Sequence, residues 1–340
     1  MSPEVAICIV TYNSAADLPD CCAAIAAQDY RPLEVVIVDC ASSDMSVDVA
    51  RRVEMPGIGH RLIALAENRG FTGGMNEAFR HTAAPYLLTL NADVRPQPSY
   101  VRCLLERFRH SPEMRIAAVT GRLVRPLEGG ERRLDACGMV LTRTWRHLDR
   151  GSGELDRGQW GEPQRVFGAT GAATLFSREA LADVAVDGEI FDPAFHSFRE
   201  DAELCFRLRE RGWEVIYEPR AGAEHRRRVL PERRRALPAA INYHSLKNRY
   251  LLRAYHQTPG NFVRTLVPAL GRDLAAFAYV LLTERSSLAA YGWLWRHRRE
   301  VLARRRRIQA RRTVAPAAID RWFSQRAPEL VPSVPAAPGR

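Results

Sequence analysis

Residues 5–13 read VAICIVTYN, a run of six apolar residues followed by three that carry hydrogen-bonding groups. Similar runs that end in polar residues return at 34–39 (EVVIVD) and at 86–93 (YLLTLNAD), and stretches with helical periodicity separate them. Strands that are apolar throughout and alternate with helices are typical of a parallel sheet covered on both faces. The sequence therefore predicts an α/β fold whose ligands bind beyond the carboxyl ends of the strands.

The expected elements follow this alternation along the chain. In the first 120 residues we place strands at 5–10, 34–39, 61–65 and 86–90, and helices at 15–28, 43–53, 74–81 and 99–109. Strands at 172–177 and 213–217 flank a helix at 200–211. From Pro238 onward the pattern is helical, with segments at 238–255, 262–283 and 291–312.

These elements divide the chain into three predicted regions. Residues 1–228 form the α/β domain, and they include a Gly-, Arg- and Glu-rich stretch at 126–165 that we expect to be an irregular insertion. Residues 229–327 form a basic helical region. Residues 328–340 are rich in Pro and Ala, a composition that predicts a disordered tail.

Composition excludes several classes of protein. The chain has 340 residues, of which 46% are hydrophobic, and this excludes a mostly disordered chain, a collagen and a small disulfide scaffold. No window holds about 18 uninterrupted apolar residues, so we expect no membrane-spanning helix. The N-terminus lacks the features of a secretory signal, which favours the cytoplasm. The seven cysteines form no C-x-x-C pair, which predicts buried, reduced thiols and no zinc site.

Charge is unevenly distributed between the two halves of the chain. Residues 1–224 hold 26 basic and 33 acidic residues, whereas residues 225–340 hold 24 basic and 6 acidic residues. A strongly basic segment favours an anionic partner, either a membrane surface or a nucleic acid. The alternative is a helical cap with a solvated basic face.

Polar residues follow the first two strands. Thr11, Tyr12 and Asn13 form a turn that could contact a base and its ribose, or in which Asn13 or Ser14 caps the next helix. Asp39 could accept a hydrogen bond from the imide N–H of uracil or thymine. Alternatively, Asp39 could be the ribose-binding Asp of a dinucleotide fold. That fold needs a G-x-G-x-x-G turn after the first strand, and residues 11–17 read TYNSAAD, so the sequence does not favour it.

Two further segments carry candidate phosphate and metal contacts. Residues 68–76 (NRGFTGGMN) form a Gly-rich turn into a helix, where glycines permit close approach and helix N–H groups suit anions. No G-K-[ST] follows, so this is not a P-loop. Asp93 directly follows a buried strand and could hold Mg²⁺ or Mn²⁺, or cap the next helix.

A block at residues 191–207, FDPAFHSFREDAELCFR, carries the candidate base. Glu200 and Asp201 begin a helix, where the helix dipole favours carboxylates. Helical neighbours point about 100° apart, so we expect one of the two to face a substrate. Glu203 lies on the flank of Glu200 and is predicted to be structural. His225 follows the strand at 213–217.

The order of these motifs is informative. VTYN, VIVDCASSD, ENRGFTGGMN, LNAD and the 191–207 block followed by a His resemble glycosyltransferase family 2, in its bacterial rhamnosyltransferase-like branch. The resemblance covers residues 4–226. It implies a GT-A nucleotide-sugar-binding fold with a mostly parallel sheet and an inverting, metal-dependent transfer of a sugar.

The resemblance also implies a role for individual residues. Those implied to bind the nucleotide sugar are Thr11, Tyr12, Asn13, Asp39, Asn68, Gly70, Phe71, Gly73, Asn76, Asn91 and Arg207. Asp93 and His225 are implied to hold the metal, with Asn91 in place of the first acid of the metal motif. Asp201, with Glu200 beside it, is implied to be the catalytic base. Two departures are Glu203 in place of Asp and Arg226–Arg228 in place of small residues.

The implied partners follow from the same resemblance. The expected cofactor is Mg²⁺ or Mn²⁺, and the expected donor is dTDP-rhamnose or, alternatively, a UDP-linked hexose or galactofuranose. The expected acceptor is a glycan or a polyprenyl-diphosphate-linked saccharide of the cell envelope, reached at the inner face of the plasma membrane through the basic helices. An Arg-rich nucleic-acid binder is the rival of another class, and it leaves Asp39, Asp93 and Asp201 unexplained. A nucleotidyltransferase would need a basic phosphate-gripping loop near the N-terminus, which is missing.

Overall fold

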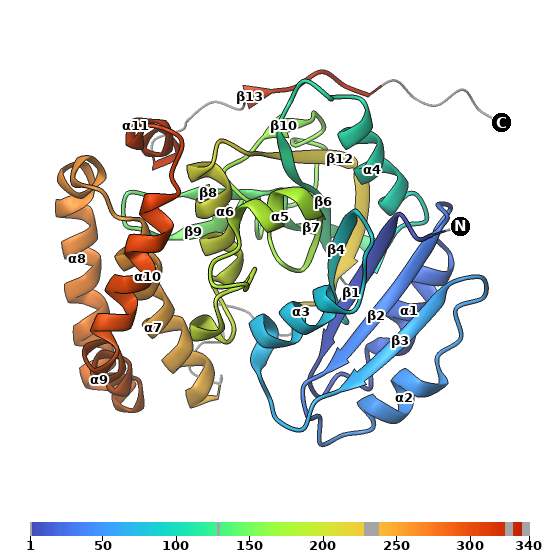
Figure 1. Cartoon of the computed structure of the whole chain (residues 1–340), viewed down its shortest axis with the longest axis horizontal. Helices are drawn as coiled ribbons and strands as arrows, with labels where there is room; N and C mark the ends of the chain where they lie inside the picture. Colours follow the sequence, from blue (N-terminus) through green and yellow to red (C-terminus); the bar gives the residue numbers. More distant parts are fainter. Residues whose placement is uncertain (1, 128–129, 228–237, 324–328, 335–340) are drawn as a thin grey trace.

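The computed structural model describes residues 2–127, 130–227, 238–323 and 329–334. A large twisted sheet forms its centre, and a group of helices packs beside it (Figure 1). Four strands run parallel in the order β4-β1-β2-β3, namely β1 Val5–Thr11, β2 Leu33–Asp39, β3 Gly59–Ala64 and β4 Tyr86–Asn91. Thr11 lies opposite Asp39, and Val10 lies opposite Asn91. This register brings the polar ends of three strands to one edge of the sheet.

The sheet continues beyond β4 through strands of mixed direction. β11 (Ala173–Ser177) runs antiparallel to β4 and to β6 (Ile116–Pro126), and β6 runs parallel to β12 (Glu214–His225). The remaining strands are short: β5 Val94–Pro96, β7 Arg132–Ala136, β8 Met139–Leu141, β9 His147–Asp149, β10 Gln164–Arg165 and β13 Glu329–Leu330. The predicted α/β class with a mostly parallel sheet is confirmed.

Helices connect and cover these strands. In the first half they are α1 Leu18–Ala26, α2 Ser46–Arg52, α3 Gly70–Arg80 and α4 Tyr100–Arg109, followed by α5 Arg178–Val184 and α6 Glu200–Glu210. The C-terminal group contains α7 Ala239–His256, α8 Pro259–Thr283, α9 Ala289–Arg296, α10 Arg298–Ala310 and α11 Pro316–Asp320. The apolar strand interiors of β1, β2 and β4 are buried between the helices on the two faces.

Three predictions about the α/β part differ from the structure. Helix α3 begins at Gly70, four residues earlier than expected, so the Gly-rich segment lies largely inside the helix. A Cβ on Gly74 would lie 2.7 Å from the Val10 side chain, so this glycine lets α3 pack closely on β1. β12 is longer than predicted, and His225 is its last residue rather than a residue beyond it. The segment 126–165 holds β7, β8, β9 and part of the main sheet, so it is not irregular throughout.

The C-terminal end also departs from expectation. The predicted helix at 291–312 is two helices, α9 and α10, separated at His297. Glu329 and Leu330 form β13 and pair with β10, so backbone hydrogen bonds order this part of the predicted tail. Residues 335–340 of that tail, and Arg228, lie outside the described residues.

The helical region and the α/β part share one apolar core. Phe195 and Phe206 of the α/β part pack in one cluster with Tyr255 of α7 and with Trp322 and Phe323 near the C-terminus. The predicted division near residue 228 therefore does not separate two independent cores. All seven cysteines are free and buried, as predicted.

Helix α8 differs from the expectation that no helix could span a membrane. Its 25 residues are long and apolar enough to do so by length and composition, because scattered polar residues interrupt the run without making it hydrophilic. Only 17% of its most apolar window is buried within the protein.

Candidate functional site

Asp39 is held in a fixed orientation at the carboxyl edge of the sheet. Its side chain is 1% exposed and accepts hydrogen bonds from Thr11 Oγ1 at 2.9 Å, from the Ser42 backbone N–H at 2.9 Å and from Ser42 Oγ at 2.5 Å. Tyr12, the residue after β1, is 53% exposed at the same edge. The structure therefore brings together the predicted base-contacting residues of the first two strands.

Asn13 connects the loops that follow β1 and β2. It adopts a left-handed backbone with φ 51°, and its side-chain oxygen accepts from the Ser43 N–H at 2.9 Å. Its own N–H donates to Ser42 Oγ at 2.9 Å. Because α1 begins only at Leu18, the alternative in which Asn13 or Ser14 caps that helix is wrong.

The N–H groups at the start of α3 are all used within the protein. Gly70 N–H donates to Asn68 Oδ1 at 2.8 Å, and Thr72 N–H donates to the His196 carbonyl at 3.1 Å. Phe71 N–H donates to Ser197 Oγ at 3.4 Å, and the Gly73 N–H donates to the backbone one turn earlier. The expectation that this helix start offers N–H groups to an anion is therefore wrong.

Two residues expected to contact the donor are engaged in packing instead. Asn76 is buried, and its amide pairs with both the N–H and the carbonyl of Phe191, each at 2.8 Å. Arg207 is also buried and binds both carboxylate oxygens of Glu203, at 2.8 and 2.7 Å. Its remaining N–H groups donate to the carbonyls of Val184 and Ile190. Both side chains thus clamp the loop before α6, and Glu203 is structural as predicted.

A hollow of about 420 Å³ lies beside α3. Among the predicted residues, Asn68, Gly73 and Asn76 line it, together with His196. Three of the expected donor-binding positions therefore face one open space, although the polar atoms of Asn76 are already paired.

Asp201 lies next to the carboxyl end of β4. Its side chain accepts hydrogen bonds from Gly171 N–H at 3.2 Å and from Ala202 N–H at 2.7 Å. The carbonyl of Ala172, the neighbour of Gly171, accepts from Asn91 N–H at 2.8 Å. Burial and repulsion from Asp149 raise the pKa of Asp201 to about 6, against the lowering effect of the two hydrogen bonds.

Glu200 lies beside Asp201 at the start of α6. It is buried, its Oε2 has no hydrogen-bond partner among the described residues, and burial together with Asp201 raises its pKa well above the ordinary value. The carboxylate of Asp201, in contrast, accepts two backbone hydrogen bonds, which favour its charged form.

The loop before α6 has a strained backbone, and a residue of α7 holds it in place. His196, Phe198 and Arg199 all have positive φ, at 62°, 71° and 70°, although none is glycine. Backbone of this kind persists only when its surroundings enforce it. Asn248 of α7 is fully buried, and its amide nitrogen lies 2.8 Å from three carbonyl oxygens, those of Phe195, Ser197 and Phe198. Sequence reasoning missed Asn248, because nothing in a helix some 50 residues away marks it as a clamp.

Replacing Asn248 by Asp should therefore misplace Asp201 without touching it. The isosteric carboxylate cannot donate to the three carbonyls, so we expect kcat to fall on the order of 10²-fold, as for a displacement of about 1 Å at a reacting group. Nucleotide affinity should stay within about threefold of the wild type, because Asp39 and Thr11 are remote in sequence and belong to other elements. Wild-type kcat in a folded Asn248→Asp protein would contradict the clamp.

The predicted metal ligands face each other across two strands. β5 pairs with the end of β12, which places His225 Nε2 at 3.3 Å from Asp93 Oδ1. His225 Nδ1 lies 2.7 Å from Asp135 Oδ2, a contact that fixes the ring and leaves Nε2 toward Asp93. Burial lowers the pKa of His225, but Asp135 and Asp93 outweigh it and raise that pKa to about 9.

This donor set fits a divalent cation only in part. One carboxylate and one imidazole lie in direct contact with each other, and a second carboxylate binds the other ring nitrogen, as behind the histidine ligand of many metal sites. Among the described residues, no three His, Cys, Asp or Glu side chains cluster so as to hold a metal ion. A Mg²⁺ or Mn²⁺ ion here would take its remaining ligands from diphosphate oxygens and water.

Asp135 and Asp149 are site residues that sequence analysis missed. They lie in the segment expected to be irregular, where no periodicity or motif marks them. Arg227, which replaces a small residue of the family pattern, bridges them at 2.9 and 2.8 Å. Asp149 in turn repels Asp201, so this chain of charges links His225 and Asp93, the predicted metal ligands, to Asp201.

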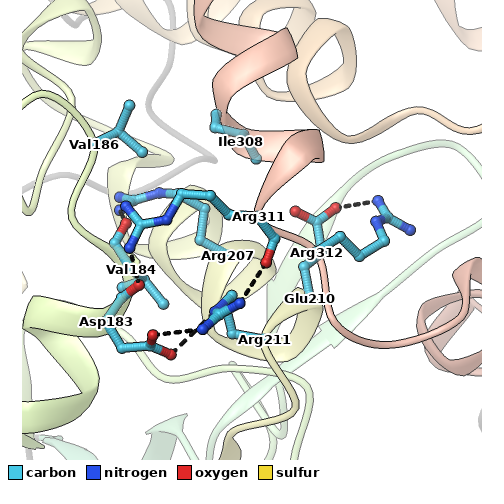
Figure 2. Close-up of a pocket in the computed structure, with 9 residues that line it drawn as sticks. All are labelled: Asp183, Val184, Val186, Arg207, Glu210, Arg211, Ile308, Arg311 and Arg312. Carbon is cyan, nitrogen blue, oxygen red and sulfur yellow. Dashed lines mark hydrogen bonds and ion pairs between the residues drawn. The ribbon is translucent and has the colours of Figure 1, made fainter.

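A second, smaller pocket lies away from these groups. It is lined by residues of α5, α6 and α10, and Figure 2 shows that it is crossed by the ion pairs Arg211–Asp183 and Arg312–Glu210. Its open space of about 10 Å³ holds no more than one water. It is therefore a packing gap between α10 and the α/β part rather than a substrate site.

Sequence comparison points to one family. The sequence model of glycosyl transferase family 2 matches residues 6–184. The poly-beta-1,6-N-acetyl-D-glucosamine synthases of Staphylococcus aureus (strain COL) and Staphylococcus epidermidis are 24% and 23% identical to this chain over 218 and 222 residues. These alignments cover 63% and 64% of this chain, but only 47% and 48% of those synthases. The chain thus spans about half the length of these curated relatives.

Structural comparison agrees on the fold. GalNAc-T7 with UDP, GalNAc and Mn²⁺ superposes with a TM-score of 0.55 at 14% identity, over 75% of this chain and 49% of that one. The mannosyltransferase PcManGT of Pyrobaculum calidifontis, with GDP-Man and Mn²⁺, gives 0.52 at 18% identity, over 96% and 89%. S. aureus TarS 1–349 with UDP-GlcNAc gives 0.54 at 13% identity, over 95% and 90%. The family match extends over more than half of the chain and the GT-A fold is shared with these structures, so the chain belongs to glycosyl transferase family 2.

Proposed function

We propose that this glycosyltransferase moves a sugar from a uridine- or thymidine-diphosphate donor to a hydroxyl group, with inversion at the anomeric carbon. The observation that carries the proposal is the placement of Asp201. It stands at the start of α6, next to the end of β4, with two N–H groups fixing its carboxylate. A base at this position can reach an acceptor bound over the edge where the nucleotide-binding strands end.

The proposed reaction needs one proton transfer by the protein. Asp201, with a pKa of about 6, is mostly ionised at neutral pH and removes the acceptor hydroxyl proton as the oxygen attacks the anomeric carbon. The bond from that carbon to the diphosphate breaks, and the nucleoside diphosphate leaves with the electron pair. Glu200 is buried and its Oε2 has no hydrogen-bond partner among the described residues, so burial disfavours the charged form that a base needs.

Asp93 and His225 are the residues that would hold Mg²⁺ or Mn²⁺ in this scheme. A bound divalent cation would offset the charge that develops on the leaving diphosphate. Asp135 orients His225 for that contact. The Mn²⁺ present with GalNAc-T7 and with PcManGT supports a metal-dependent reaction here.

The donor sugar is the least constrained part of the proposal. We put dTDP-rhamnose first, from the motif pattern of the sequence, and a UDP-linked hexose second. UDP-N-acetylglucosamine enters as that second donor because TarS is bound to it and because the staphylococcal relatives are named for a poly-N-acetylglucosamine product. We propose a glycan or polyprenyl-diphosphate-linked acceptor of the cell envelope, reached from the cytoplasmic face of the membrane.

Nucleotide-dependent thermal stability tests this assignment. We expect UDP or dTDP to raise the melting temperature in the presence of Mn²⁺, and CDP and ADP to have little effect, because cytosine and adenine present an acceptor nitrogen where uracil and thymine offer Asp39 an N–H. Asp39→Asn should weaken UDP or dTDP binding about 10- to 100-fold, the loss of a hydrogen bond to a charged group. Equal stabilisation by CDP and UDP would refute the role of Asp39.

A further inference from the structure

Helix α8 carries its largest apolar side chains on the outside. Val267 is 80% exposed and Leu274 is 62% exposed. The other large apolar side chains exposed along the same helix are Phe262, Val263, Leu266, Leu270, Phe277, Leu281 and Leu282. In Figure 1, α8 lies at the outer edge of the helical group, away from the central sheet.

The side of α8 that faces the protein carries small, polar and charged residues as well as the buried Ala269 and Val280. Thr265 is buried, accepts a hydrogen bond from Trp145 Nε1 at 3.0 Å and donates one to the carbonyl of Asn261. Asp273 binds Arg249 at 2.7 Å and Arg253 at 2.6 Å, both on α7. These contacts fix the rotation of the helix about its axis, so its apolar face cannot turn inward without breaking them.

The outward residues form one continuous stripe. Val263, Val267, Leu270, Leu274 and Phe277 follow one another at intervals of three and four, which places them on one helical face. The helix has 25 residues and is therefore about 37 Å long. A contiguous apolar face of this extent on a folded protein marks an interaction surface.

Charge around the stripe distinguishes between possible occupants. Beyond its C-terminal end, Arg285, Arg296 and Arg298 are exposed, and the guanidinium of Arg298 lies 4.4 Å from the ring centre of Trp295, which is 69% exposed. A row of apolar side chains with arginine and tryptophan at its end matches the boundary between lipid headgroups and acyl chains. Two copies meeting through this face in an antiparallel pair would need acids where each arginine cluster lands, and the stripe has none.

Several arginines of the second half of α10 and just after it are engaged within the protein. Arg304 binds Asp192 at 2.9 Å, Arg305 donates to backbone carbonyls of α7, and Arg312, two residues after α10, binds Glu210 at 2.5 Å. The sequence had suggested the arginine-rich helix as the membrane contact. The structure instead uses much of it to join the helical group to the α/β part.

We propose that α8 lies flat on an anionic membrane, with the Val263–Phe277 stripe in the outer part of the acyl layer and the exposed arginines near α9 against lipid phosphates. The contacts of Thr265 and Asp273 hold the helix to the protein, so it lies on the bilayer and does not cross it. This surface does not depend on the identity of the donor sugar. It would hold the enzyme at the place where a lipid-linked acceptor is found.

Flotation of the full chain with lipid vesicles tests the proposal. Vesicles of phosphatidylcholine with 30% phosphatidylglycerol should carry the wild-type protein upward, and pure phosphatidylcholine vesicles should carry at least fivefold less. Val267→Asp/Leu274→Asp should reduce flotation with the anionic vesicles at least tenfold. Leu330→Asp is the matched control, because Leu330 is 63% exposed on β13, far from α8 in the chain, and its flotation should equal that of the wild type.

Three outcomes would overturn the proposal. One is equal flotation of the wild type and Val267→Asp/Leu274→Asp. Another is the absence of wild-type flotation with either kind of vesicle. The third is a wild-type dimer in light scattering that the double substitution converts to a monomer without any vesicle binding, since the stripe would then be an interface between copies. Circular dichroism of each variant confirms folding, and the three positions probed lie on the surface.

Discussion

Asp201→Asn is expected to remove nearly all sugar transfer while leaving nucleotide binding intact. The amide of Asn cannot take up the proton of the attacking hydroxyl group, and a positioned general base typically contributes about 10²–10⁴-fold to the rate. The measurement is kcat with the donor that the thermal-shift experiment selects, together with the Kd of UDP or dTDP by calorimetry. We expect that Kd to change by less than about threefold, because Asp39 and Asp93 remain in place.

The pH dependence of the wild type provides the matching control. Asp201 must be ionised to act, so kcat/KM should be constant above its pKa of about 6 and fall tenfold per pH unit below it. The residual activity of Asp201→Asn should lack this dependence. If the variant keeps wild-type turnover, or if both proteins show the same acid limb, Asp201 is not the base.

Arg207→Met is expected to cause the largest loss of stability. The substitution keeps most of the apolar stem but leaves the buried Glu203 carboxylate without its bidentate partner, with only His256 at 3.6 Å. Breaking a buried ion pair in this way lowers the free energy of unfolding by about 3–5 kcal/mol. Urea unfolding at neutral pH measures the change.

Two controls separate this effect from general damage. Arg51→Met removes an exposed pair with Asp48 and should cost less than about 1 kcal/mol. Arg207→Met/Glu203→Met should be more stable than Arg207→Met alone, because no unpaired charge remains. If Arg207 binds the donor rather than the fold, Arg207→Met will unfold like the wild type and lose nucleotide affinity.

Acid should weaken the wild type through the same pair. Burial raises the pKa of Glu203, but Arg207 and His256 outweigh it and hold that pKa at about 2, below the ordinary value of 4.5. The stabilisation is therefore complete above about pH 4.5 and is lost as the pH falls toward 2. Arg207→Met should show a flatter loss of stability over this range, which unfolding measurements at stepped pH would reveal.

The part of the fold that sequence alone could predict is the part built from local pattern. β1, β2 and β4 were placed to within one residue, because runs such as VAICIV and EVVIVD are buried on both faces and leave no ambiguity of period. The strands of 126–165 were missed, because most have two to five residues and are specified by their partners in the sheet. The predicted helix at 74–81 begins later than α3, because glycines are typical of turns. Only the structure shows that a glycine here lets α3 pack closely on β1.

For the candidate site, sequence placed residues at strand ends better than it assigned their contacts. Asp39 and Asp93 lie at one edge of the sheet because parallel strands end together, which pattern can foresee. Asp201 lies in the first turn of α6 and is placed near the end of β4 by its hydrogen bond with Gly171 N–H. Asn76 and Arg207 are residue types that often bind ligands. In the structure, Asn76 pairs with the backbone of Phe191, more than a hundred residues away, and Arg207 binds the carboxylate of Glu203, four residues earlier. Only the folded chain shows that these groups are already satisfied.

The contacts of the Asn248 amide and the aromatic cluster around Phe206 join the α/β part to the helical region. They therefore limit which segments of this chain can be exchanged with those of its relatives. A crossover at residue 228 would pair one parent's α6 loop with another parent's α7, and the three carbonyls at Phe195, Ser197 and Phe198 would meet whatever side chain that helix supplied. Functional hybrids should therefore inherit residues 191–256 as one block from a single parent. The residues that must come from one parent are therefore set by the contacts of Asn248 rather than by the boundary between sheet and helices.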